Sequence, residues 1–365
     1  MNIKLEIKKL LDITHDNRKK IRVTLLAHIH NDCKNKLDNN SLETEYFSPE
    51  EFEELIDSVN SYGIYVDTYY DQNNFFLEVI HKQYFNLEKE FNIVYDTTQK
   101  GSGRGKDSLI PAFCDLFNII YTGTNPYVNS LTSNKYDWTK LLDYSNIQVP
   151  KTIKITQNSN FLDFSKELFL DKLTITKPNF TYASIGISKS SLNSSRDKAI
   201  EQAMKINNTL HQPAIIQEFI AGYEIEIGII GSINGPIILP IVGISIEEKK
   251  LLKNSFLDFE KVSIDDYTFY LFEEIAPKKI ISQIIKACNK LSSIIDFEGH
   301  LRIDMRVDTK FDKFYIFDIN VYPHIVEHSS FNFAFKSLGF ETTELLPALI
   351  GNAIQNYHQY TSDQI

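Results

Sequence analysis

The chain has 365 residues, which is enough for two or three domains of ordinary size. Its 38 Lys and Arg residues against 48 Asp and Glu residues give a net charge of −10, which argues against a protein that follows nucleic-acid phosphates, although a local basic pocket could hold one nucleotide. The three cysteines show no metal-ligand spacing, so we expect inert thiols in a reducing cytoplasm.

No segment has the character of a membrane span or a signal peptide. The N-terminal residues alternate between charged and apolar types, without the apolar core of a signal peptide. The most apolar stretch, Ile225 to Ile246, is broken by Glu226, Asn234 and two prolines, whereas a span needs roughly 20 clean apolar residues. We therefore expect a cytoplasmic protein with small-molecule substrates and without membrane or nucleic-acid partners.

Strands and helices alternate over the first third of the chain. Short apolar strands are predicted at 22–27, 64–68 and 91–95. Ser48-Pro49-Glu50-Glu51 carries the signals of a helix start with a capping box, and Gly63 marks the end of that helix. A glycine-rich loop follows the third strand, and a helix over 109–117 follows the loop. This alternation predicts a parallel α/β domain.

The remainder of the chain has an α+β pattern. Helices are predicted at 134–144, 278–295 and 343–354, and strands at 173–176, 215–219, 224–230, 301–307 and 315–319. Asn234-Gly235 is a typical hairpin turn between two strands.

The last two predicted strands carry the strongest chemical signal. Because side chains alternate along a strand, Arg302 and Asp304 face the same side, and so do Asp318 and Asn320. If the strands pair across the turn 309–313, one surface presents two carboxylates, an amide oxygen and a guanidinium. Such oxygen ligands suit Mg²⁺ bound together with nucleotide phosphates. An ordinary half-solvated sheet face is the competing interpretation.

Two other segments could hold parts of a nucleotide. Thr174–Lys189 ends a strand at Lys177 and continues into a loop of small residues, whose backbone N–H groups could cradle phosphates. Gln217–Glu224 leads a strand into a glycine-containing turn that could offer backbone groups to adenine and a carboxylate to ribose. Each segment, taken alone, is also explained by a plain turn.

The segment Gly101–Asp107 suggests a P-loop but fails its spacing. Three residues separate Gly101 from Gly105 where four are needed, and Asp107 follows Lys106 where Ser or Thr should stand. A substrate-binding or structural loop is favoured. A P-loop NTPase would bind nucleotide through Lys106 rather than Lys177.

Five segments, in this order, together resemble the D-alanine–D-alanine ligase branch of the ATP-grasp superfamily. They are GKDSLIPAFCDLFNIIYTG, TSNKYDWTKLLDYSNIQVP, KPNFTYASIGISK, QEFIAGYEIEIGIIG and RIDMRVD with FDIN. The resemblance implies an ATP-grasp fold preceded by a parallel α/β (pre-ATP-grasp) domain. The implied domains are an N-terminal α/β substrate domain (1–129), a small central lid (130–216) and a C-terminal domain with the metal site (217–365), with ATP clamped between the last two.

The resemblance also implies roles for the matching residues. Contacts to ATP would come from Lys135, Lys177, Gln217, Glu218, Phe219, Ile220 and Glu224. In this set Lys177 would lie near the phosphates, residues 217–220 at the adenine, and Glu224 at the ribose. Asp304, Asp318 and Asn320 would ligate Mg²⁺, as two ions, with Mn²⁺ as an alternative. Asp318 stands where the family usually has Glu.

Three residues are implied in catalysis. Arg302 would stabilise the acyl phosphate and the tetrahedral intermediate. Lys261 stands where a mobile loop of the family supplies a phosphate-binding lysine. Ser184 keeps one hydroxyl of a Ser-Ser pair, of which Ala183 loses the other, in a loop expected to close over ATP and exclude water.

The departures from the family lie where it contacts its amino acids. AHIHNDCKNKLDNN lacks the family's Glu-x-Glu-Val-Ser signature, GSGRGKDS lacks its His-Gly, Val262 replaces a tyrosine, and Pro323-His324 replaces Pro-Gly. The expected substrate contacts are His28, His30, Arg104, Lys106, His324, Glu327 and Ser329, where solvent exposure is the alternative for each.

The sequence therefore predicts an ATP-dependent carboxylate–amine ligase that forms an amide through an acyl phosphate, on amino acids other than two D-alanines. A true D-alanine–D-alanine ligase is the first alternative. A non-catalytic nucleotide-binding regulator is the second, but it would not need the complete set of cations and metal ligands. A homodimer is a possible assembly.

Overall fold

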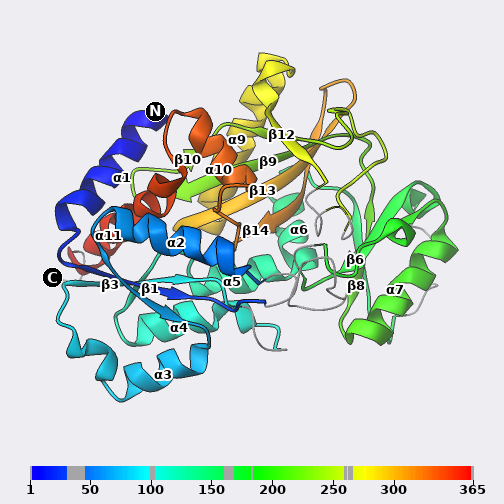
Figure 1. Cartoon of the computed structure of the whole chain (residues 1–365). Coiled ribbons are helices and arrows are strands. Elements are labelled where there is room, and N and C mark those ends of the chain that lie inside the picture. Colours follow the sequence, from blue (N-terminus) through cyan, green and yellow to red (C-terminus); the bar gives the residue numbers. More distant parts are fainter. Residues whose placement is uncertain are drawn as a thin grey trace.

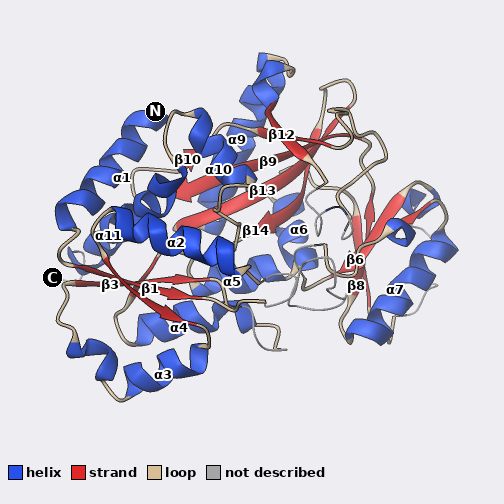
Figure 2. Ribbon diagram, in the orientation of Figure 1, coloured by secondary structure: helices blue, strands red, loops and turns tan. Residues whose placement is uncertain are grey.

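The computed structural model describes residues 2–30, 46–98, 103–159, 168–181, 184–258, 261 and 266–362. In these ranges the strands form three sheets, each covered by helices (Figures 1 and 2). No helix in the described ranges is both long enough and apolar enough to cross a membrane. Of the cysteines, Cys114 and Cys288 are buried free thiols, and Cys33 lies outside the described residues.

The N-terminal sheet is parallel and has the strand order β2–β1–β3–β4. Its strands are β1 (Ile21–Leu26), β2 (Tyr65–Tyr69), β3 (Phe91–Asp96) and β4 (Ile120–Tyr121), and the helices of this region are α1 (Ile3–Asn17), α2 (Pro49–Ser61), α3 (Gln72–Ile80) and α4 (Leu109–Leu116). The capping box of α2 forms as predicted, because the Glu51 N–H donates to Ser48 Oγ at 3.1 Å and the Ser48 N–H donates to Glu51 Oε2 at 2.6 Å. The predicted parallel α/β domain is confirmed.

Helix α1 was not among the predicted elements. It packs its buried face against the C-terminal helix α11 (Thr342–Ser362), where Thr14 Oγ1 donates to the Pro347 carbonyl at 2.7 Å. Ser58 of α2 likewise donates to the Thr343 carbonyl at 2.8 Å. The last helix of the chain thus completes the core of the N-terminal unit, a contact that a division into consecutive domains does not express.

The second sheet is antiparallel, has the order β5–β8–β6–β7 and corresponds to the predicted lid. Its strands are β5 (Thr152–Ile155), β6 (Thr174–Pro178), β7 (Leu192–Asn193) and β8 (Ala214–Glu218). Helix α7 (Arg196–Leu210) covers one face, and the pair stands at one side of the molecule in Figure 1. Strand β8 stays in this sheet through Glu218, so the expected boundary at 216 falls inside a strand.

The third sheet is the largest and is antiparallel, with the order β12–β11–β9–β13–β14 and β10 paired to β9. Its strands are β9 (Gly222–Gly231), β10 (Ile237–Ile238), β11 (Val242–Ser245), β12 (Thr268–Leu271), β13 (Gly299–Asp308) and β14 (Phe314–Asn320). The accompanying helices are α5 (Pro126–Ser133), α6 (Lys135–Tyr144), α9 (Lys278–Ile295) and α10 (Ser330–Ser337). The predicted combination of α/β and α+β parts is confirmed.

The two faces of the third sheet differ in character. Ile303, Met305 and Val307 of β13 are fully buried in an apolar core that includes Ile284 and Leu291 of α9. Since side chains alternate along a strand, the residues between them point to the opposite face. That opposite face carries the charged residues of the candidate active site.

Candidate active site

Strands β13 and β14 bring the predicted metal ligands together. They pair antiparallel, with Arg302 opposite Asn320 and Asp304 opposite Asp318, and a register shift follows between Asp304 and Met305. The predicted pairing across the short turn is therefore confirmed. Two carboxylates, an amide and a guanidinium occupy one patch, as side-chain alternation requires.

Arg302 is held by two carboxylates. Its Nε donates to Asp304 Oδ1 at 2.7 Å, its Nη2 donates to Asp304 Oδ2 at 2.8 Å, and Nη2 also lies 3.4 Å from Glu226 Oε1. Burial acts to lower the pKa of Arg302, but the two carboxylates raise it above its ordinary value. A bidentate pair of this kind fixes the orientation of the guanidinium as well as its charge.

Glu226 was missed by the sequence analysis. It lies on β9 directly opposite Asp304, because β9 pairs with the other edge of β13. Burial raises its pKa to about 7, against the lowering effect of Arg302. The signal that could have found it was simple alternation, since Glu224 and Glu226 must share one face of their strand.

The two predicted ATP lysines converge on β14. Lys135 Nζ donates to both carboxylate oxygens of Asp318, at 2.6 and 2.7 Å, and Lys177 Nζ donates to the Phe317 carbonyl at 2.8 Å. Burial lowers the pKa of Lys177 to about 8. Burial acts to raise the pKa of Asp318, but the charges of Lys135 and Lys177 bring it below its ordinary value. The site thus keeps an ionised carboxylate between two cations.

A buried asparagine connects the two lysines. Asn179 follows β6, is 0% exposed, and donates from Nδ2 to Asn134 Oδ1 at 2.8 Å. Its carbonyl accepts the Lys135 N–H at 3.1 Å, and its Oδ1 accepts the Tyr136 N–H at 2.9 Å. The first turn of α6, which begins at Lys135, is therefore fastened to the strand that carries Lys177.

Two groups of the predicted adenine segment form hydrogen bonds within the predicted lid. The Gln217 side chain is buried and donates to Thr152 Oγ1 at 3.1 Å, and the Phe219 N–H donates to the Leu173 carbonyl at 3.0 Å. Glu218 lies 3.6 Å from Lys172 in an ion pair. The Gln217 amide N–H and the Phe219 N–H thus have partners within the chain. The assignment of Gln217, Glu218 and the backbone of Phe219 and Ile220 to adenine stays a prediction.

The predicted phosphate loop contacts the chain shortly before Lys261. Ser184 Oγ donates to the Leu257 carbonyl at 3.3 Å, and Ser184 has a φ of 56°, a left-handed conformation that few non-glycine residues adopt. Lys261 Nζ lies 3.3 Å from Asp258 Oδ1. Ala183 and Val262 lie outside the described residues. Ser184 thus contacts Leu257, the neighbour of Asp258, with which Lys261 pairs.

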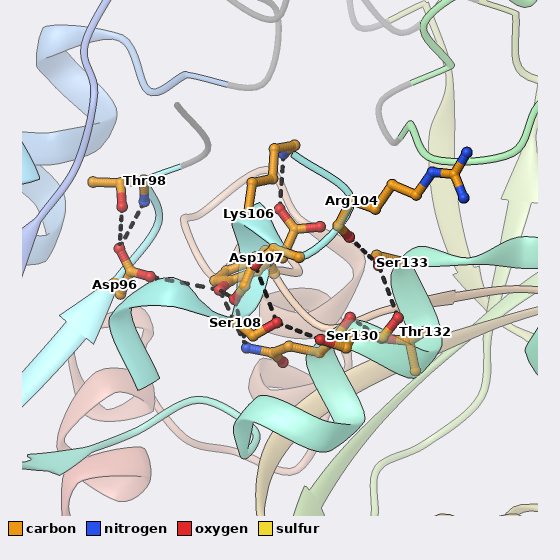
Figure 3. Close-up of polar contacts among 12 residues, drawn as sticks. Asp96, Thr98, Arg104, Lys106, Asp107, Ser108, Ser130, Thr132 and Ser133 are labelled. Atoms are coloured by element: carbon orange, nitrogen blue, oxygen red, sulfur yellow. Dashed lines mark hydrogen bonds and ion pairs between the residues drawn. The ribbon is translucent and has the colours of Figure 1, made fainter. Parts of the chain in front are cut away.

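A second polar cluster lies at the carboxyl end of β3 (Figure 3). Asp96 Oδ1 accepts the Thr98 N–H at 2.8 Å and the Thr98 hydroxyl at 2.7 Å. Lys106 Nζ donates to Asp107 Oδ1 at 2.7 Å, and Asp107 is 2% exposed. Arg104 points away from this cluster, and its guanidinium lies 5.4 Å from the centre of the Phe180 ring of the lid. Ligands of α/β proteins often bind at the carboxyl ends of parallel strands, which favours a substrate site here.

The other predicted substrate contacts fall into two groups. His28, His30 and His324 lie together with the N-terminal segment: His28 is 5.0 Å from the Tyr46 ring, and His324 is 4.8 Å from the Phe47 ring. His30 is buried and its N–H donates to the Phe47 carbonyl at 3.1 Å. The structure therefore brings the histidines from both ends of the chain to one region.

Ser329 and Glu327 have structural partners. Ser329 caps α10, where its Oγ accepts the Asn332 N–H at 3.2 Å and donates to the Val326 carbonyl at 2.8 Å. Glu327 is exposed and lies 2.8 Å from Lys336 in an ion pair. The hydroxyl of Ser329 thus has partners within the chain and Glu327 lies at the surface, and their assignment as substrate contacts stays a prediction.

The donor set at β13 and β14 fits a hard divalent cation. Asp304, Asp318 and Asn320 supply only oxygen ligands, which suits Mg²⁺ when nucleotide phosphates complete the shell. Among the described residues, no three His, Cys, Asp or Glu side chains form a ready-made metal group. Lys135 and Arg302 supply the charges that balance Asp318 and Asp304 in this structure.

The fold and the sequence agree with those of one enzyme class. Residues 167–351 match the family model described as D-ala D-ala ligase C-terminus, which is just over half of the chain. The D-alanine–D-alanine ligase of Carboxydothermus hydrogenoformans is 26% identical over 254 residues, covering 67% of this chain and 77% of the relative. That of Azobacteroides pseudotrichonymphae is 28% identical over 253 residues, covering 67% and 73%.

Solved structures of the same family share the fold. The Bacillus anthracis D-alanine–D-alanine ligase, solved with ATP, superposes with a TM-score of 0.67 at 17% identity, covering 93% of this chain and 99% of that one. The VanG D-Ala:D-Ser ligase of Enterococcus faecalis gives 0.66 at 16% identity, covering 92% and 99%. The protein is an ATP-grasp ligase that forms C–N bonds. Within that class, it belongs to the D-alanine–D-alanine ligase family.

Proposed function

We propose that this enzyme binds ATP with Mg²⁺ and joins the carboxylate of one amino acid to the amine of another through an acyl phosphate, and that its substrates are not two D-alanines. The observation that carries the chemistry is the convergence of Lys135, Lys177 and Arg302 on the face that bears Asp304 and Asp318. Phosphoryl transfer develops negative charge, and fixed cations in a water-poor site stabilise it.

Each group has a defined task in this proposal. An oxygen of the substrate carboxylate attacks the γ-phosphorus of ATP, ADP leaves, and the amine then attacks the acyl carbon and expels phosphate. Lys135 and Lys177 hold the phosphates, and Arg302 stabilises the oxyanion of the tetrahedral intermediate. Asp304, Asp318 and Asn320 would hold Mg²⁺, or Mn²⁺, which neutralises phosphate charge when bound.

The proposal that the substrates differ from two D-alanines rests on polar residues of the N-terminal domain and on His324. Lys106, paired with Asp107, brings a positive charge to the loop that is predicted to contact a substrate. His28, His30 and His324 are further polar groups in a region where the family signature is missing. The Enterococcus relative is named for a D-Ala:D-Ser product, so members of this fold differ in the second amino acid. A true D-alanine–D-alanine ligase is the alternative, because the named relatives carry that activity in their names.

The acyl phosphate is tested by isotope transfer. With a substrate labelled with ¹⁸O in the carboxylate, the wild-type enzyme should release phosphate that carries one labelled oxygen. Release of unlabelled phosphate would contradict the proposed intermediate. Asp318→Ala should abolish ligation-coupled ADP release, and Asp312→Ala, in the exposed turn between β13 and β14, is the matched control. ADP release at the wild-type rate from Asp318→Ala would show that the metal assignment is wrong.

A further inference from the structure

Arg306 is a buried cation that no step above uses. It lies on β13 on the same face as Arg302 and Asp304, directly opposite Glu224 of β9. The residue is 4% exposed, its Nη2 lies 2.6 Å from Glu224 Oε2, and Nη2 also donates to the Ser255 carbonyl at 2.8 Å. The guanidinium carbon lies 5.0 Å from the centre of the Phe219 ring.

One donor nitrogen of this guanidinium is unused. Nη1 of Arg306 has no hydrogen-bond partner in the described part of the chain. Buried donors, and above all those of a charged group, nearly always have a partner, so an exception calls for a reason. A ligand that binds beside the guanidinium would supply the missing acceptor.

The neighbours of Arg306 indicate which ligand that is. Phe219 belongs to the segment proposed to hold the adenine, and Glu224 is the carboxylate proposed to accept ribose hydroxyls. Arg306 contacts both, so it lies at the junction between the base and the sugar. A planar guanidinium can stack on a purine ring and still donate hydrogen bonds in its own plane.

We propose that Arg306 binds the nucleoside part of ATP: it holds the Glu224 carboxylate toward the ribose hydroxyls and donates its Nη1 N–H to the nucleoside. This rests on the proposed use of ATP and adds a residue that determines nucleotide affinity and ribose recognition. Glu224 keeps its other oxygen for a ribose hydroxyl, and the positive charge of Arg306 favours the ionised carboxylate. Although burial raises the pKa of Glu224, Arg306 opposes that rise.

The test measures binding of ATP and of 2′-deoxy-ATP to the full chain by calorimetry, without amino acids. Arg306→Met keeps the length of the side chain but removes its donors, and it should weaken ATP binding about tenfold, close to the 1.4 kcal/mol of one lost interaction. It should also bring the ratio of the two dissociation constants toward one, because Glu224 is no longer oriented. Arg22→Met removes a buried arginine that pairs with Asp67 in the N-terminal sheet, and this control should leave both constants unchanged.

Each outcome decides between the two proposals. Wild-type dissociation constants and an unchanged ratio in a folded Arg306→Met protein overturn the role of Arg306 and leave the ligase proposal intact. A wild-type protein that binds no ATP overturns the proposed function, and the role of Arg306 with it. If Arg306→Met does not fold, Arg306→Lys decides, because it keeps the charge opposite Glu224 but loses the planar donor fork. A several-fold weaker ATP affinity supports the proposal, and wild-type affinity contradicts it.

Discussion

The Tyr322 hydroxyl donates to the Asp107 carbonyl at 2.5 Å, and the Tyr322 N–H donates to Asn320 Oδ1 at 2.8 Å. One residue therefore joins the loop of the N-terminal domain to a proposed metal ligand at the end of β14. The same hydroxyl lies 3.5 Å from Asp96 Oδ2. Hydrogen bonds of Tyr322 thus link the loop proposed to bind substrate to the sheet that carries the proposed metal site.

Removal of this hydroxyl should affect the amino acid more than the nucleotide. We expect Tyr322→Phe to raise the KM for an amino-acid substrate several-fold and to leave the dissociation constant of ATP within a factor of two, since net hydrogen bonds are worth about 1 kcal/mol. Steady-state kinetics and calorimetry measure the two quantities. Tyr127→Phe, at an exposed position of α5, is the control. Equal changes in KM and ATP affinity would show that Tyr322 has no specific relation to the substrate loop.

Glu226 should act through Arg302. Asp304 must share its oxygens between Arg302 and the proposed metal, whereas Glu226 is not a proposed metal ligand and lies 3.4 Å from the guanidinium. Glu226→Gln removes one of the two charges that orient Arg302, so we expect kcat to fall about tenfold with little change in the KM for ATP. Glu274→Gln, on the surface, should have no effect. A change confined to KM would contradict this role.

Asp96 should make stability depend on pH. Burial raises its pKa to about 7 in the folded chain, from an ordinary value of 3.8. Between these two values the folded state binds more protons than the unfolded state, so this group's contribution to the free energy of unfolding falls as pH rises. Asp96→Asn should remove the cost of ionising this buried carboxylate. It should therefore raise the free energy of unfolding by at least about 1 kcal/mol at pH 8, with little change at pH 4.

Urea unfolding of both proteins at several pH values measures this difference. Asn keeps the acceptor for the Thr98 N–H, so the local turn is preserved. A difference between the two proteins that does not grow from pH 4 to pH 8 would show that the carboxylate is ionised in the folded protein throughout.

Gly228 should tolerate no side chain. It lies on β9 opposite Arg302, and a Cβ there would approach Phe331 Cδ2 of α10 to 2.8 Å. We expect Gly228→Ala to lower the free energy of unfolding by about 1–3 kcal/mol, because α10 must shift to relieve the contact. Gly123→Ala is the control, since a Cβ at Gly123 meets no atom within 4 Å. Equal stability of the two variants, measured by urea unfolding, would contradict the packing described here.

The parts of the site that sequence could predict are those set by local rules. Alternation along two strands joined by a short turn places Arg302, Asp304, Asp318 and Asn320 on one face without knowledge of the rest of the fold. The N-cap at Ser48 and the helix over 278–295 follow from capping residues and from apolar spacing in the same way.

The missed parts depend on contacts between distant segments. The hydrogen bond from Thr14 to the Pro347 carbonyl joins residues 333 positions apart, so no local sequence pattern predicts it. Asn179 connects two lysines through groups that only the folded chain brings together. The use of the Phe219 N–H by Leu173 likewise follows from the end of β8 meeting β6, which alternation alone does not determine.

The most direct test of the central claim is a screen for ADP release with pairs of L- and D-amino acids and small carboxylates, in which the product masses are measured. The proposed function predicts one ADP for each amide formed, with at least one pair other than two D-alanines, and slow turnover with D-alanine alone. Fast ADP release with D-alanine alone and a dipeptide of two D-alanines as the main product would contradict it.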